Sequence, residues 1–176
     1  MNIDKQIEIL KKISIRGRLA YGMKCLEQYV KENEINDELI DKVFDILWEF
    51  TTSDELDVWD EKISDFNPKH ILNIKPEKIE SEYPTITINE YYELKKFYEN
   101  SDTDFISMIE KVIEIGTGNL YGGTDEYSSW TLEPTLEVIK MSELKLEHIP
   151  DITKFKSFEY SEDKGWGKKI NRVTCE

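Results

Sequence analysis

The chain has 176 residues, of which 39% are hydrophobic and 34% charged, and its 37 acidic and 23 basic side chains leave a net charge of −14. A chain of this length buries roughly 70% of its unfolded surface, so it can fold without a disulfide or a metal. The content of large apolar side chains excludes a disordered protein. We expect one domain over residues 1–176.

Two features predict a cytoplasmic protein. Cys25 and Cys175 are not the closely spaced set of a secreted disulfide scaffold. The start of the sequence has no unbroken apolar run with a cleavage site, and no stretch reaches the roughly 18 apolar residues of a membrane span. We therefore expect no signal peptide and no membrane contact.

Apolar residues three and four positions apart predict helices over residues 3–13 and 15–33. Gly17 and Gly22 weaken the second helix by about 1 kcal/mol each relative to alanine, which is tolerable where another helix packs closely. Cys25 lies in the same helical pattern, and we interpret it as a small core residue.

Asp37 is a good N-cap for the next helix, over about residues 38–52. This helix carries two apolar stripes, and Trp48 lies on the second. A helix that is apolar on most sides is central. We therefore predict that residues 38–52 form the middle of the core.

A short segment, DELDVWDEKI, starts at Asp54, and Asn67-Pro68 ends it. Residues 74–87 are predicted to be an extended connection, in which Pro76 and Pro84 argue against an internal strand.

Residues 87–90 have the form of a capping box for a helix that ends at Asn100. Another helix follows and is expected to end at Gly116 or Gly118. Pro134 fits the first turn of a last helix over about 133–145.

These elements amount to six to eight helices with no alternating strand. The predicted class is all-α, either a helical bundle or an irregular helical array, with a mostly irregular C-terminal segment over residues 150–176.

No residue pattern indicates catalysis, a metal site or a cofactor. His70 and His148 lie far apart and outside any metal-binding motif. Asp102 and Asp104 could hold a cation, but they lack the pattern of a calcium loop and are better explained as a helix cap. A carboxylate pair acting as general acid and base stays open, because its burial cannot be read from the sequence.

The most glycine-rich segment, GTGNLYGGTDEYSS, superficially resembles a phosphate loop. A phosphate loop needs a preceding strand and a Lys-Ser or Lys-Thr pair, whereas here a helix precedes and Asp125 and Glu126 follow. We interpret the segment as a helix end and a tight turn that carries Tyr121 at its tip.

The acidic side chains are densest in residues 32–65, where thirteen carboxylates and two lysines leave a net charge of −11. Such a field repels nucleic acid and attracts basic partners. Many cytosolic proteins are acidic simply for solubility, and this alternative stays open.

Several short motifs together resemble a family of small bacterial immunity proteins of the polymorphic-toxin type. These motifs are Arg18-Leu-Ala-Tyr21-Gly22, Leu47-Trp48-Glu49-Phe50-Thr51, Leu56-Asp57-Val58-Trp59, Asn119-Leu-Tyr121-Gly122-Gly123 and Gly165-Trp166-Gly167. The resemblance implies a non-enzymatic protein that binds a cognate toxin domain and blocks it. A basic nuclease toxin would suit the acidic charge.

The hypothetical partner-binding residues lie in the short segment and the glycine-rich loop. They are Asp54, Glu55, Asp57, Trp59, Asp60, Glu61 and Tyr121. An aromatic residue among charges suits an interface hot spot, but Trp59 can equally be buried beneath a solvated helix. A small carboxylate-using enzyme, a helical adaptor with a peptide groove and a homo-oligomeric structural protein remain alternatives, and the oligomeric state is left open.

Overall fold

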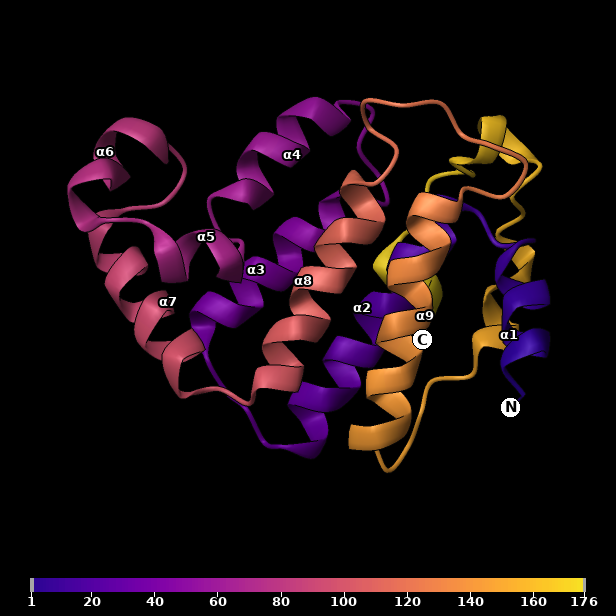
Figure 1. Cartoon of the computed structure of the whole chain (residues 1–176), viewed down its shortest axis with the longest axis horizontal. Coiled ribbons are helices and arrows are strands. Elements are labelled where there is room, and N and C mark those ends of the chain that lie inside the picture. The colour runs from indigo at the N-terminus through magenta and orange to yellow at the C-terminus, as the bar shows by residue number, and fades with distance from the viewer. Residues whose placement is uncertain (1, 176) are drawn as a thin grey trace.

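The computed structural model describes residues 2–175, which form an all-α protein (Figure 1). The α-helices are α1 (Ile3–Leu10), α2 (Ile15–Glu32), α3 (Glu38–Glu49), α4 (Leu56–Ser64), α5 (Pro68–Asn73), α6 (Ile79–Glu82), α7 (Ile88–Asn100), α8 (Thr103–Thr117) and α9 (Ser129–Lys145). Short 3₁₀ turns are η1 (Pro76–Lys78), η2 (Ile152–Ser157), η3 (Glu162–Gly165) and η4 (Arg172–Cys175). In this part of the chain there is no β-strand, only an isolated bridge between Ile13 and Glu159.

The central helix is α2, and the prediction that residues 38–52 form the middle of the core is wrong. Helix α2 packs against both α8 and α9 and also contacts α3. Gly22 permits the close approach to α8, because a Cβ atom there would lie 2.9 Å from Cγ2 of Val112. Helix α3 is peripheral: its apolar side faces the core and its acidic seam faces solvent.

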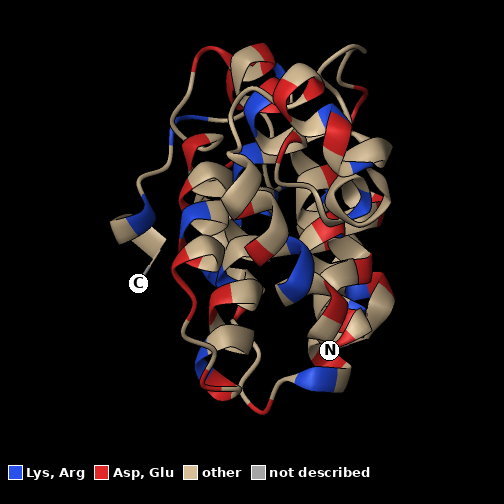
Figure 2. Cartoon of the chain, turned by 90° about the vertical axis from the view of Figure 1, so that its left-hand side faces the viewer, with Lys and Arg blue, Asp and Glu red and all other residues tan. Residues whose placement is uncertain are grey.

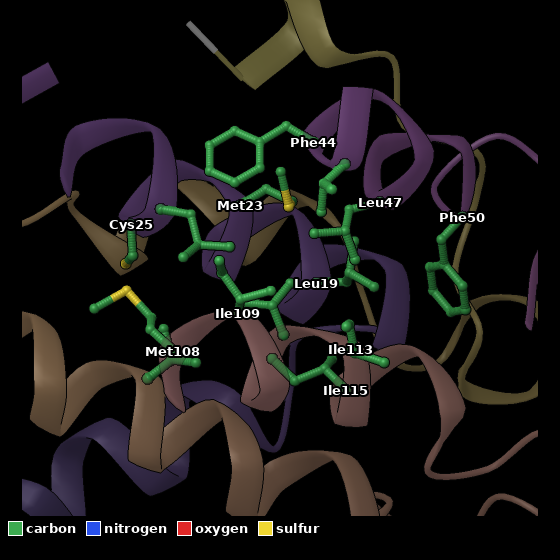
Figure 3. Close-up of a cluster of buried hydrophobic side chains, with 14 of the residues drawn as sticks. Leu19, Met23, Cys25, Phe44, Leu47, Phe50, Met108, Ile109, Ile113 and Ile115 are labelled. Carbon is green, nitrogen blue, oxygen red and sulfur yellow. The ribbon is translucent and has the colours of Figure 1, made fainter. Parts of the chain in front are cut away.

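The buried apolar side chains form one cluster between α2, α3 and α8 and extend outward from it (Figure 3). Leu19 and Met23 of α2 lie between Phe44 of α3 and Ile109 of α8. Cys25 is buried in this cluster, as predicted. Each fully buried side chain of this size contributes about 1.5–3 kcal/mol of transfer free energy.

The segment between α5 and α7 is not extended, so that prediction is also wrong. Pro76 opens η1, where its missing N–H removes no needed hydrogen bond, and the chain continues directly into α6. Ile79 is fully buried and draws this turn onto the core. The short α5 and α6 bring the described helices to nine, one more than the expected maximum of eight.

Several predicted helix starts are confirmed by their capping hydrogen bonds. The Asp37 carboxylate accepts hydrogen bonds from two amides in the first turn of α3. The capping box of Thr87 and Glu90 is present at α7, and Asp102 caps α8. Helix α9 begins at Ser129, four residues before the predicted 133, so Pro134 lies inside this helix rather than in its first turn.

Arg18 lies at the junction of α1, α2 and α9 and is 0% exposed. Its Nε and Nη2 atoms donate to the Leu10 carbonyl at 3.1 and 2.9 Å, and Nη2 also donates to the Tyr127 carbonyl at 2.6 Å. Its Nη1 atom donates to the Ser128 carbonyl at 2.9 Å and to Oγ1 of Thr131 at 2.7 Å. Burial lowers the pKa of Arg18 to about 10, so the guanidinium stays charged at neutral pH.

Arg16 holds the C-terminal segment against the helices. Its guanidinium donates to the carbonyls of Gly167 at 3.1 Å and Ser53 at 2.6 Å. Thr51 and Ile170 add a reciprocal pair, in which each contributes a donor and a carbonyl acceptor. These contacts fix the start of the connection between α3 and α4.

Candidate protein-interaction surface

Trp59 belongs to the core, so the alternative of a buried Trp59 is correct and its place among the partner-binding residues is wrong. Its side chain is 2% exposed, and its Nε1 atom donates to the Ile46 carbonyl at 2.7 Å. The indole packs edge-on against Phe50, with 4.8 Å between ring centroids. It also lies over Gly116 of α8, where a Cβ atom would collide with it. Trp59 therefore fixes α4 to the body of the molecule.

Part of the acidic segment over residues 32–65 has partners within the chain. Asp54 forms an ion pair with Lys169 at 2.5 Å, and this hydrogen bond lowers the pKa of Asp54. Asp65 is buried and accepts hydrogen bonds from the amide and hydroxyl of Thr85. Acidic positions also continue along other helices, as Figure 2 shows. Because Asp54 and Asp65 are bound within the fold, they are weaker candidates for partner binding.

The outer side of α4 carries carboxylates of a different kind. Glu55, Asp57 and Glu61 are exposed, and within residues 2–175 none of them forms an ion pair. Val58 is exposed between them. Trp59 and Ile63 anchor the opposite side of α4, so these carboxylates are held outward on a fixed helix.

The fold brings Tyr121 to α4 from 61 positions along the chain. The Tyr121 hydroxyl donates to Oδ2 of Asp60 at 2.9 Å, although the tyrosine side chain is 82% exposed. The hydrogen bond to Asp60, together with the charges of Asp57 and Glu61, raises the pKa of Tyr121. Two sites that were selected separately from the sequence therefore form one surface.

The loop over residues 118–128 is anchored through its C-terminal half, and Tyr121 lies in its exposed part. Arg18 holds the carbonyls of Tyr127 and Ser128. The Tyr160 hydroxyl donates to the Asp125 carbonyl at 2.8 Å. Gly122 and Gly123 face open space.

Trp130 was missed by the sequence analysis and is 69% exposed at the start of α9. It lines a hollow of about 330 Å³ together with Tyr121. The predicted helix start at residue 133 left Trp130 outside the periodic pattern. Had the helix been extended back to residue 129, Trp130 would have shared a face with Glu133 and Glu137.

We name this region the acidic–aromatic surface. Its members are Glu55, Asp57, Asp60, Glu61, Tyr121 and Trp130.

The largest hollow lies elsewhere, between the C-terminal end of α2, the start of α3 and α7, and measures about 1090 Å³. Tyr29, Leu39 and Phe97 supply its apolar lining. Lys42 of α3 and Glu90 of α7 form an ion pair within it at 2.6 Å. The lining is mixed in polarity, which suits a peptide better than a small apolar ligand.

Neither histidine shows a catalytic arrangement. Nδ1 of His70 lies 2.9 Å from the Ser64 carbonyl and 3.1 Å from the Ser64 hydroxyl oxygen. Because a carbonyl only accepts hydrogen bonds, Nδ1 carries the hydrogen there and does not act as a base toward the Ser64 hydroxyl. The exposed His148 ring lies 3.3 Å from a Glu32 oxygen. Asp102 caps α8 by accepting a hydrogen bond from the Asp104 amide at 2.8 Å, and both carboxylates pair with Lys145. In residues 2–175, no three His, Cys, Asp or Glu side chains are grouped so as to hold a metal ion.

The best carboxylate for acid–base chemistry is Glu110 on α8. Burial raises its pKa, and the charge of Glu114, one turn further on, raises it too. Glu114 lines a hollow beside Trp130 and pairs with Lys111 at 2.7 Å. Glu110 lines neither that hollow nor the largest one, so the two carboxylates do not face each other across either space.

Comparison of the chain with protein-family models, curated proteins and solved structures finds no match. Across the described residues, no helix has the length and apolar character needed to cross a membrane.

Proposed function

We propose that the protein is a non-catalytic inhibitor that binds a basic protein through the acidic–aromatic surface, as an immunity protein binds its cognate toxin. The observation that carries this proposal is the set of exposed, unpaired carboxylates on α4 beside the exposed Tyr121. Other carboxylates of the same segment, such as Asp54 and Asp65, are used within the fold. Those of α4 are free to meet a partner's cations.

Charge and aromatic content would serve different steps of binding. Complementary charge steers encounter and raises association rates by roughly 10–10³ at low salt. Large aromatic side chains carry much of the binding energy once water is excluded. Tyr121 is already hydrogen-bonded to Asp60, so its ring is partly pre-positioned and loses less conformational entropy on binding.

The test uses the charge reversal of Glu55, Asp57 and Glu61 to lysine, because none of these residues supports the fold through an ion pair. The partner for this test is sought among the products of the neighbouring genes, since an immunity gene is inherited with its toxin, and a basic toxin domain is the expected partner. We expect association to slow at least about tenfold at low salt, with a flatter dependence on salt.

The matched control reverses three exposed carboxylates far from Tyr121 in the sequence, Glu77, Glu80 and Glu99. It makes the same change of net charge, and circular dichroism checks that both variants fold. If both variants slow association equally, the surface has no special role and only net charge matters.

A peptide-binding adaptor is the second candidate, and the 1090 Å³ hollow favours it. Five of the residues that line it are acidic and two are lysines, so the peptide would be basic and extended. Glu93→Lys with Phe97→Asp would then abolish partner binding while the α4 reversal leaves it unchanged. If the α4 reversal weakens partner binding and the double variant leaves it unchanged, the result supports the inhibitor.

A further inference from the structure

The hollow between Tyr121 and Trp130 has the chemistry of a cation site. Its floor is formed by the C-terminal end of α8 and the glycine-rich turn, and none of its lining side chains is charged. Of the two exposed aromatic rings, Tyr121 comes from the loop over residues 118–128 and Trp130 from the first turn of α9. Cations are attracted to the faces of tryptophan and tyrosine rings, most strongly to tryptophan.

The main chain around the hollow is electronegative. Helix α8 has 15 residues and ends at Thr117, without a basic side chain in its last turn. The final carbonyls of a helix lack intrahelical donors and carry partial negative charge. Pro134 has no N–H to offer the carbonyl of Trp130, four residues before it. That carbonyl oxygen lies 3.0 Å from the position of a Cβ atom on Gly118.

Carboxylates flank both rings. The Tyr121 hydroxyl donates a hydrogen bond to the Asp60 carboxylate, and this bond increases the electron density of the Tyr121 ring. On the other side, Glu114 and Glu133 line the neighbouring hollow beside Trp130. Lys111 lies there as well, but its ammonium pairs with Glu114 at 2.7 Å.

We propose that this hollow, the Tyr121–Trp130 slot, binds an arginine side chain of the partner protein. A planar guanidinium stacks on aromatic faces and donates to several carbonyls at once. A lysine ammonium is more strongly hydrated and does not stack in this way. The inference rests on the proposed function for its partner, while the chemistry of the slot can be tested without one.

The test is an NMR titration of the whole protein with the capped tripeptide acetyl-Gly-Arg-Gly-amide. We expect the amide signals of Gly122 and Gly123 to shift, with a dissociation constant of about a millimolar. The lysine tripeptide should bind more weakly. The citrulline tripeptide, which has the same shape without the charge, should cause no comparable shift.

Two variants remove the slot's rings, Tyr121→Leu and Trp130→Leu. Each should weaken arginine binding about fivefold to tenfold, the effect of one partly desolvated cation–π contact. Tyr92→Leu is the control, because Tyr92 is 53% exposed on α7, outside the slot. Equal binding of the arginine and citrulline peptides, or equal losses in the control, overturns the proposal.

The slot and the proposed function can fail separately. In one outcome, the α4 reversal abolishes toxin binding but the arginine peptide does not shift the signals of Gly122 and Gly123. This outcome supports the proposed inhibitor and contradicts the proposed arginine slot. In the other outcome, the arginine peptide shifts the signals of both glycines but the α4 reversal leaves toxin binding unchanged. This outcome supports the slot and contradicts the role of the α4 carboxylates in toxin binding.

Discussion

The buried arginines and the carboxylates of α4 are charged groups in opposite environments, the former bonded inside the fold and the latter exposed to solvent. Arg18 lies in the interior with five hydrogen bonds, four of them to main-chain carbonyls. Glu55, Asp57 and Glu61 lie in solvent on a helix that is firmly anchored by Trp59. The chain thus supplies its own partners for the charges that its fold requires. The charges for which it supplies none are the better candidates for binding another molecule.

The largest expected effect is at Arg18. Arg18→Met should lower the free energy of unfolding by about 4–5 kcal/mol, because it leaves a cavity and removes the donors of a buried charged network. Arg18→Lys keeps the charge but not the forked geometry of the donors. Its free energy of unfolding should therefore lie between those of the natural sequence and Arg18→Met. Urea unfolding measures both variants.

Lys12→Met is the control for Arg18, because it removes a positive charge from an exposed position. Its effect should stay within about 0.5 kcal/mol. A loss below about 1 kcal/mol for Arg18→Met would contradict the structural role of the buried guanidinium.

The next effect separates the buried Trp59 from the exposed Trp130. Trp59→Ala should destabilise the fold by about 3–4 kcal/mol, because a fully buried indole is lost. Trp130→Ala should change stability by less than about 0.5 kcal/mol and should act on binding instead. Thermal unfolding of both variants tests this, and the reverse order of stabilities would show that α4 and α9 are misplaced.

The smallest effect is a pH dependence at Glu32, which joins α2 to the turn after α9. Hydrogen bonds from the Gln28 side chain and from the amides of Glu147 and His148 together lower its pKa to about 2. Because the folded-state pKa lies below the ordinary 4.5, Glu32 contributes stability above pH 4.5. That contribution disappears as the pH falls from 4.5 towards 2.

Glu32→Gln should therefore be less stable than the natural sequence at pH 6 and approach it at pH 3. Urea midpoints at both values measure the difference. Glu99→Gln, an exposed carboxylate on α7, is the control. A difference between Glu32→Gln and the natural sequence that does not change with pH would exclude the carboxylate as its source.

Local signals predicted much of the fold. Asp37, the Thr87–Glu90 box and Asp102 are recognisable because a capping residue lies within three positions of the amide that it binds. The start of α9 carries no such signal. Ser128 has a positive φ of 48° and makes no side-chain capping hydrogen bond, so the sequence predicts a later helix start, at about residue 133, with Pro134 in the first turn.

The surface was predicted only in part, because its assembly depends on tertiary contacts. The acidity of α4 and the exposure of Tyr121 follow from residue types and turn composition. Their hydrogen bond, across 61 positions, does not. The sequence left Trp59 open between a partner-binding and a buried residue and gave no signal for Trp130, since burial is decided by tertiary contacts such as those of Gly116 and Phe50 with the Trp59 indole.

The most direct test of the proposed surface is hydrogen exchange of the chain with and without a basic toxin domain sought among the products of the neighbouring genes. The expected result is slower exchange in residues 55–64 and 118–131, which contain the acidic–aromatic surface. Protection confined to the start of α3 and to α7, around the largest hollow, would contradict the proposal and favour the peptide-binding adaptor.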